Sequence, residues 1–511
     1  MPRELSGRPI ARWALLALIA AGLVAHSLVF DFVSDDAFIS FVYSRNLAEH
    51  GQLVFNLGER VEGFTNFLWT VLLGGLMALG LEPELTSRLL GTGFAVATLV
   101  VVVRLADRQA RAAGWGLVAA ALLAAASGYA CWASGGLETQ MFTFLAVLAM
   151  TLYLEERWVW SGLCLALAAM TRPEGALIAA VCGVHRMGVR AFVDRRPWPG
   201  GAELRWGGAF LAVFVPYWLW RWQYYGWFFP NTFYVKAGGA PSPEYSATML
   251  SRGLYYVWQW AWQSRAIFAA PLVLLALRRA PRFTSLALLL TANYLYYAVS
   301  VGGDFMGLHR FVMPLFVTTA VLAALAIAEL GRWLPRAAPW LGLALVTGFA
   351  ASQVKVTREA LVPRADNGID RPGYLAVYAH DRGLIGKALA PHILPQDTSV
   401  FGGAGVQPYY ARLRGVDVFG LVSEEIAHEE PPSNPRPGHQ KWARPERVLR
   451  WAPTFLFYCY DLHPTPKQYR LCGEAGFFQA RGYEPVTLFV PGLRERGEYY
   501  TFLKRKDRVW P

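Results

Sequence analysis

Long apolar runs recur along the first 354 residues of the chain, separated by short segments rich in arginine. An α-helix needs roughly 20 mostly apolar residues to cross the hydrocarbon core of a bilayer. The composition agrees, because 55% of the residues are hydrophobic and only 16% are charged, against roughly 25% charged in an ordinary soluble protein. The sequence therefore predicts a polytopic α-helical membrane protein.

Arginine clusters predict which helix ends face the cytoplasm, because loops on that side carry an excess of Lys and Arg. Arginines in residues 3–12 place the N-terminus in the cytoplasm. The run 64–81 is expected to be re-entrant or interfacial, since a crossing there would put the arginines of 104–111 outside. The run 158–185 is expected to turn back at a Pro-Glu-Gly sequence. The eleven expected crossings are 10–30, 87–103, 114–132, 140–154, two within 158–185, 206–224, 253–277, 283–300, 311–330 and 340–353.

The formal net charge of +12 raises the question of a nucleic-acid partner. The basic residues lie between apolar runs, as the topology rule for membrane proteins requires. We therefore expect a lipid bilayer as the partner of these residues and no nucleic acid.

The composition changes near residue 355, where apolar runs shorten and Pro, Gly, Asp and Arg become frequent. The segment 374–389 is typical of an amphipathic helix, and five short apolar runs between turn signals predict strands. These strands are expected at 399–402, 417–421, 454–459, 485–490 and 499–503. Residues 355–511 thus predict an extracytoplasmic α/β domain, in which Cys459 and Cys472 could pair if the compartment is oxidising. The glycine-rich stretch 402–405 does not complete a dinucleotide fingerprint and is interpreted as a turn.

Two adjacent carboxylates, Asp35 and Asp36, follow the first apolar run by five residues. They are expected near the lipid headgroups, where a charge is costly unless it has a partner or a function. A structural explanation stands beside the functional one, since Ser34 is a good N-cap and acids in the first turn complement the helix dipole. Helix capping explains the presence of one acid better than the presence of two adjacent acids.

With this topology, many ionisable residues fall in the outer connections or at outer helix ends. They are Asp35, Asp36, Arg45, Glu138, Arg172, Glu174, Lys236, Asp304, His309 and Arg310. Each has an ordinary explanation alone, such as pairing of Arg172 with Glu174 or helix capping by Asp304. Together they suit one chemistry: a carboxylate takes a proton from a hydroxyl, and cations hold a departing phosphate. The sequence therefore favours glycosyl transfer from a lipid-linked phosphosugar.

The order of these motifs resembles the class C integral-membrane glycosyltransferases, and within them the mycobacterial terminal β-1,2-arabinofuranosyltransferase family and its bacterial relatives. The resemblance covers nearly the whole chain. Its motifs are 35–69, Ser134-Gly135-Gly136-Leu137-Glu138-Thr139, Thr171-Arg172-Pro173-Glu174-Gly175, Gly302-Gly303-Asp304-Phe305-Met306 with His309-Arg310, 417–421 and 436–441.

The resemblance implies that residues 1–354 form a catalytic domain in the bacterial cytoplasmic (inner) membrane. It implies inverting transfer of a sugar, with arabinofuranose as one candidate, from a polyprenyl-phosphate donor to a cell-envelope glycan acceptor. Asp35 or Asp36 would be the base. The other roles would be Glu138 and Asp304 on the acceptor or cation side, and Arg172, His309, Arg310, Lys236 and Arg45 on the donor-phosphate side. No cofactor is required, while a divalent cation at Asp35, Asp36 and Glu138 stays open.

Two alternatives remain open at this point. The same fold could transfer another polyprenyl-phosphate sugar to a lipid or to a protein hydroxyl. The acids could instead couple protons in a transporter of a lipid-linked glycan. A transporter is expected to carry charges near the bilayer midplane and paired broken helices, and the sequence shows no related halves.

Overall fold

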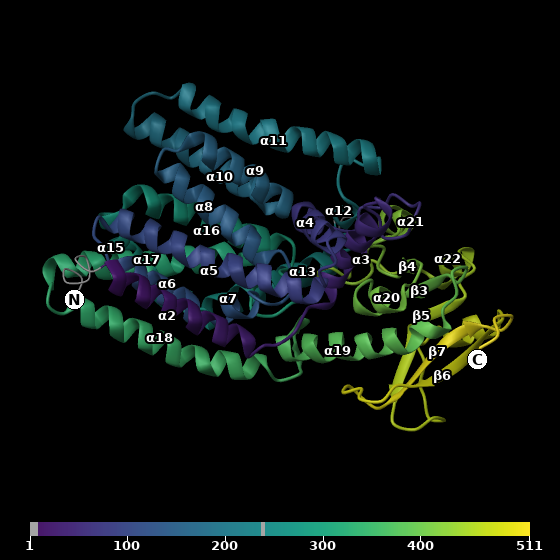
Figure 1. The fold of residues 1–511 in the computed structure, drawn as a ribbon. Helices are drawn as coiled ribbons and strands as arrows, with labels where there is room; N and C mark the ends of the chain where they lie inside the picture. Colours follow the sequence, from purple (N-terminus) through teal and green to yellow (C-terminus); the bar gives the residue numbers. More distant parts are fainter. Residues whose placement is uncertain (1–8, 237–240, 511) are drawn as a thin grey trace.

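The computed structural model describes residues 9–236 and 241–510 as a long helical bundle with a smaller sheet domain at one end (Figure 1). We call this the domain end of the bundle. The predictions that rest on Arg3 and Arg8 lie outside the described residues. The bundle helices are α2 (Pro9–Leu28), α5 (Pro83–Ala110), α6 (Trp115–Ala125), α7 (Ser127–Cys131), α8 (Thr139–Leu154), α9 (Trp158–Thr171), α10 (Glu174–Gly188), α11 (Gly201–Tyr225), α13 (Pro243–Gln263), α14 (Ala266–Ala269), α15 (Val273–Arg279), α16 (Pro281–Ser300), α17 (Met313–Trp333) and α18 (Ala338–Ala360).

The polytopic fold that the hydropathy predicts is confirmed, with differences in detail. Within the described residues, four helices are long and apolar enough to cross a membrane, or five if the bent α13–α15 segment counts as one span. The apolar helices α6, α8 and α9 are shorter. The total of eleven membrane crossings therefore stays a prediction.

Three short helices lie at the domain end instead of running along the bundle (Figure 1). They are α3 (Asp35–His50), α4 (Phe67–Ala78) and α12 (Asn231–Lys236). At 12 residues and 1.5 Å per residue, α4 falls well short of a hydrocarbon core about 30 Å thick. It packs against α3, as expected for an apolar segment that does not cross.

Two local breaks shape the bundle near this end. Helices α9 and α10 are separated by Arg172 and Pro173, which agrees with the expected turn in 158–185. The segment expected to cross at 253–277 is bent: α13 starts at Pro243, and the chain turns by 69° between Gln263 and Ala266. Arg265 adopts a left-handed backbone conformation (φ 60°) at this bend.

The C-terminal domain is built on a mixed five-stranded sheet of order β4-β3-β5-β7-β6. Strands β3 (Ser399–Phe401), β4 (Gly415–Asp417) and β5 (Phe455–His463) are parallel, and β6 (Tyr483–Phe489) and β7 (Tyr499–Arg505) add antiparallel pairs. The prediction of a strand at 417–421 is wrong. The strand ends at Asp417, whose carboxylate accepts the backbone N–H groups of Leu421 (3.0 Å) and Val422 (2.8 Å) and closes a turn.

Helices connect the sheet to the bundle and cover it. The long α18 runs along the bundle and leads to α19 (Pro372–Leu389), which continues to the sheet (Figure 1). The predicted boundary at residue 355 falls inside α18. The remaining elements are the two-residue strands β1 (Ala365–Asp366) and β2 (Ile369–Asp370), and the short helices α20 (Val406–Ala411), α21 (Glu424–Glu429), α22 (Pro445–Arg450) and α23 (Ala475–Gln479).

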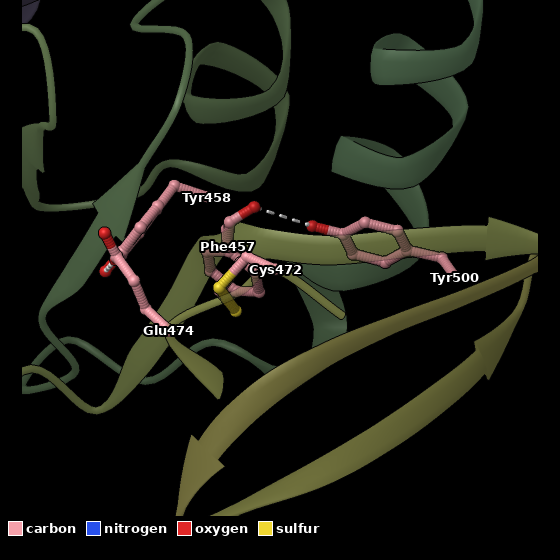
Figure 2. The surroundings of a disulfide bond; sticks show 6 residues. Phe457, Tyr458, Cys472, Glu474 and Tyr500 are labelled. Atoms are coloured by element: carbon pink, nitrogen blue, oxygen red, sulfur yellow. Dashed lines mark hydrogen bonds between the residues drawn. A yellow bond between two sulfur atoms is a disulfide. The ribbon is translucent and has the colours of Figure 1, made fainter. Parts of the chain in front are cut away.

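A disulfide joins Cys459 on β5 to Cys472, with the Cα atoms 5.0 Å apart (Figure 2). Next to it, the hydroxyl of Tyr458 donates a hydrogen bond to the carboxylate of Glu474 (2.9 Å). Disulfides persist in oxidising compartments, so this bond agrees with the predicted extracytoplasmic domain. The other cysteines, Cys131, Cys164 and Cys182, are free.

The topology can be tested with single cysteines at exposed positions. Leu57, in the loop after α3, and Trp198, in the loop before α11, are both exposed. We expect a membrane-impermeant maleimide to label Leu57→Cys in intact cells, and Trp198→Cys only after permeabilisation, because arginine-rich loops face the cytoplasm. Labelling of both positions from the same side would contradict the topology.

Candidate active site

The start of α3 is tied to two distant connections of the bundle. The Ser34 N–H donates to the carbonyl of Gly135 (3.0 Å), and its hydroxyl lies 3.7 Å from the sulfur of Met306. The Ser34 side chain makes no capping hydrogen bond to α3. The helix therefore begins where three segments of the chain meet, with Asp35 and Asp36 in its first turn.

Asp36 belongs to a charged group with Arg310 and Asp304. Arg310 Nε donates to Asp304 Oδ2 (2.6 Å), and its Nη2 lies 3.5 Å from Asp36 Oδ2. The guanidinium also lies over the ring of Trp132, 5.7 Å from the centroid. Asp304 is buried and holds Arg310 in one orientation, so Asp36 faces a fixed cation.

A second group is centred on Arg172, at the break between α9 and α10. Arg172 donates to Glu138 (2.8 Å) and to Glu174 (2.9 Å), and Asn66 donates to the other oxygen of Glu138 (3.0 Å). All three charged side chains are buried. The guanidinium of Arg172 lies 5.4 Å from the centroid of Phe311, and that of Arg310 lies 6.0 Å from it. The two groups are therefore neighbours across one aromatic ring.

Lys236 at the end of α12 joins this constellation from a third direction. Its side chain is exposed, and it interacts electrostatically with Asp36, Glu174 and Asp304. We call the combined set the domain-end charge cluster. Its members are Asp36, Glu138, Arg172, Glu174, Lys236, Asp304 and Arg310. They come from five segments that are far apart in the sequence, and the fold brings these segments together.

Asp35 points away from this cluster and toward the C-terminal domain. Its Oδ1 accepts the backbone N–H of Val406 (2.8 Å). Consecutive helical residues are rotated by about 100°, so adjacent acids in one helix face different surroundings. Burial raises the pKa of Asp35 to about 6, against the opposing effect of the Val406 N–H.

Two of the expected phosphate-binding residues make other contacts. Arg45 donates to the carbonyl of Tyr409 (2.8 Å) and covers its ring, which fastens α3 to α20. His309 Nε2 lies 2.9 Å from Gln263 Oε1, and burial lowers the pKa of His309 to about 3. His309 is therefore neutral at physiological pH, and its contacts, like those of Arg45, do not support a role as a phosphate-binding cation.

The carboxylates considered for a divalent cation do not gather around one point. Asp35 is held by Val406, and Glu138 is held by Arg172 and Asn66. Among the residues that the structure describes, no three His, Cys, Asp or Glu side chains form a group that could hold a metal ion. Asp35, Asp36 and Glu138 do not fit as a ligand set, and we derive no step through a cation.

Two polar residues beside the cluster, Asn66 and His439, lie in segments of the resemblance but received no role from the sequence. Asn66 orients Glu138, and the ring of His439 packs between Phe305 and Phe419 (centroids 4.9 and 4.5 Å). Burial, together with Arg436, lowers the pKa of His439 to about 4. The segment 436–441 had been singled out by resemblance, but no local pattern in the sequence identifies His439 as a neighbour of the site.

The two ion pairs of buried Arg172 lead to a prediction about the free energy of unfolding. Arg172→Gln leaves Glu138 and Glu174 without their cation, and we expect a loss of about 3–5 kcal/mol in the free energy of unfolding. Chemical denaturation of the purified protein measures it. The matched control is Arg157→Gln, whose exposed side chain pairs with Glu155 at 3.8 Å; a loss below about 1 kcal/mol is expected. Equal losses would contradict the structural role of Arg172.

The chain also resembles known proteins in sequence and in fold. The chain is similar to the terminal β-(1→2)-arabinofuranosyltransferase of Mycobacterium tuberculosis, with 24% identity over 538 residues that cover 84% of this chain and 83% of that protein. Residues 375–503 match the model of a domain of unknown function, DUF8728.

Solved structures share the fold at lower sequence identity. ArnT from Cupriavidus metallidurans, crystallised bound to undecaprenyl phosphate, superposes with a TM-score of 0.61 and 13% identity, covering 98% of this chain and all of that one. Its apo form gives a TM-score of 0.59 and 14% identity over 98% and 99% of the two chains. The solved structures show that the chain shares the fold of ArnT, which agrees with the class C fold that the resemblance implied.

Proposed function

We propose that the protein transfers a sugar from a polyprenyl-phosphate donor to a hydroxyl of a cell-envelope glycan, with inversion at the anomeric carbon. The donor class is supported by the fold shared with ArnT, which has been crystallised with undecaprenyl phosphate. Arabinofuranose is the favoured sugar because the curated relative is an arabinofuranosyltransferase. The reaction is placed at the outer face of the bacterial cytoplasmic membrane.

The observation that carries this proposal is the accessibility of Asp36 within a group of buried charges. Its side chain is 33% exposed, while those of Glu138, Glu174 and Asp304 are 8%, 5% and 3% exposed. A general base must reach the proton that it removes. Of these four carboxylates, Asp36 is therefore the one that an acceptor hydroxyl can approach.

The proposed reaction uses a carboxylate and two cations that lie beside one another in the cluster. The carboxylate of Asp36 takes the proton from the acceptor hydroxyl, and that oxygen attacks the anomeric carbon from the face opposite the phosphate. The bond between the anomeric carbon and the phosphate oxygen breaks, and its electron pair leaves with the polyprenyl phosphate. Arg310 and Lys236 stabilise the charge that develops on the phosphate, at no reorganisation cost for the prearranged Arg310.

The other cluster residues position these groups. Both carboxylate partners of Arg172 are buried, at 8% and 5% exposed, whereas one partner of Arg310 is the accessible Asp36. We assign Arg172, with Glu138, to holding the α9–α10 turn against the segment that carries Asn66. Asp304 accepts from Arg310 and holds its guanidinium in position.

The charge cluster also bears on the transporter alternative. Transport of a lipid-linked glycan would call for charges near the bilayer midplane. Here the elements that supply the charges meet at the domain end (Figure 1), which favours transfer. Transfer of another sugar, or transfer to a lipid or protein hydroxyl, uses the same geometry, and acceptor assays with the purified protein separate these cases.

The assignment of the base is tested by comparing the isosteric variants Asp36→Asn and Asp35→Asn. We expect Asp36→Asn to lower kcat by about 10²–10⁴-fold, because the amide cannot accept the proton, while binding of polyprenyl phosphate persists. Asp31→Asn, at an exposed residue paired with Arg88, is the control and should retain activity. A larger loss in Asp35→Asn than in Asp36→Asn would assign the base to Asp35 instead.

The pH dependence follows from the surroundings of Asp36. Burial raises its pKa, and Arg310 opposes this effect. Because the base must be ionised, activity is present above this raised pKa and is lost as the pH falls through it. Arg310→Gln removes the opposing cation, so we expect the acid limb of kcat/KM to move to higher pH. Arg332→Gln, at an exposed residue outside the site, should leave the limb in place. A downward shift in Arg310→Gln would contradict the assignment.

A further inference from the structure

Lys236 reaches the domain-end charge cluster from α12, a helix of six residues. A lysine side chain is long and flexible, so the place of its ammonium group depends on how firmly the backbone beneath it is held. Helix α12 packs against α21 of the C-terminal domain (Figure 1). The contacts that hold α12 therefore bear on one of the two cations that are proposed to bind the donor phosphate.

Asn231, the first residue of α12, joins the bundle to the C-terminal domain. The residue is 3% exposed, and its Nδ2 donates to the carbonyls of Gly420 (2.8 Å), Leu421 (2.9 Å) and Ser423 (3.3 Å). Its backbone N–H donates to the carbonyl of Glu62 (3.1 Å). One residue therefore fastens the start of α12 to a loop of the bundle and to a turn of the domain.

Both of these partners are themselves held in place. The domain turn is closed by the carboxylate of Asp417, which accepts two backbone N–H groups. Arg221, near the end of α11, donates through Nε to Glu62 (3.0 Å) and through Nη1 to the carbonyl of Phe228 (2.7 Å), in the segment that leads to α12. A buried, hydrogen-bonded network of this kind rigidifies the segments that it joins. The Asn231 amide is therefore bound to a rigid frame.

A stack of rings holds the same segment from the domain side. The ring centroid of His428 on α21 lies 3.9 Å from that of Trp227, which precedes α12, and 4.1 Å from that of Tyr234 within α12. Burial, together with Lys441, lowers the pKa of His428, so the imidazole is neutral at pH 7. It therefore stacks as an uncharged aromatic ring.

Asn231 and Lys236 lie on different faces of α12. Successive helical residues are rotated by about 100°, so five residues along the helix turn the side chain by about 140°. Asn231 and Val235 are both buried and share the anchored face, while the side chain of Lys236 is exposed. We propose that Asn231 and His428 are positioning residues, which hold α12 so that Lys236 meets the phosphate of the donor; this inference rests on the proposed function.

The test measures binding of undecaprenyl phosphate to the full-length protein in lipid nanodiscs, without turnover. Lys236→Met removes the ammonium group, and we expect the Kd to rise about tenfold, the effect of one lost charged hydrogen bond. Asn231→Ala removes the amide that fastens α12 and should raise the Kd by a similar factor. Asn434→Ala, the same change at an exposed asparagine, is the control and should bind as the wild type does.

The double variant separates positioning from a general loss of structure. If Asn231 acts through Lys236, then Asn231→Ala adds nothing to Lys236→Met, because the group that it positions is already gone. We therefore expect the double variant to bind as Lys236→Met does. Losses that multiply, or wild-type binding by Asn231→Ala, would overturn the positioning role and leave the proposed function standing. Wild-type binding by Lys236→Met would contradict the role of Lys236 in the proposed function, and this inference with it.

A second pair of variants keeps the inference testable if Asn231→Ala does not fold. His428→Ala removes the ring stack and should raise the Kd for undecaprenyl phosphate by about two- to tenfold, the effect of one lost aromatic pair. His428→Phe keeps a ring against Trp227 and Tyr234 and should restore the affinity. Binding by His428→Phe as weak as that of His428→Ala, or binding by His428→Ala equal to that of the wild type, would contradict the inference.

Discussion

The site depends on compensation between buried charges where the helices meet the C-terminal domain. Isolated charges are costly in such surroundings, and a buried ion is tolerated when it is paired and hydrogen-bonded. Asp304 compensates Arg310, and Glu138 and Glu174 compensate Arg172. The first pair holds the connection between α16 and α17, and the second joins the start of α8 to the break between α9 and α10. Asp36 is left partly exposed in front of a cation whose orientation is already set, which is the arrangement that the proposed transfer requires.

The C-terminal domain is part of this arrangement. It contributes His439 next to the charge cluster, and Arg436, whose guanidinium donates to Asp370 (2.7 Å). Its glycine-rich stretch 402–405 and Val406 contact Asp35 directly. The two adjacent acids therefore serve different parts of the protein, since one faces the membrane bundle and the other faces the domain.

Much of the fold could be predicted because it follows from local patterns. Apolar runs locate the bundle helices, and the Pro-Glu-Gly sequence indicates the turn between α9 and α10. The sequence also places Asp36, Glu138, Arg172, Asp304 and Arg310 on one side, which the structure brings together. Tertiary contacts decide the rest. The opposite directions of Asp35 and Asp36, the neutral state of His309 and the contact of Arg45 with Tyr409 depend on segments distant in sequence. The bend at Arg265 and the contacts of Asn231 with the domain likewise have no local signature.

The central claim is that a donor phosphate and Asp36 face each other across the same reaction centre. An experimental structure of the full chain with bound polyprenyl phosphate tests it most directly. The account predicts that the phosphate lies within hydrogen-bonding distance of Arg310 or Lys236, on the side open to Asp36. A phosphate bound elsewhere, with Arg310 enclosed by protein atoms and Asp36 remote from the lipid head, would contradict it.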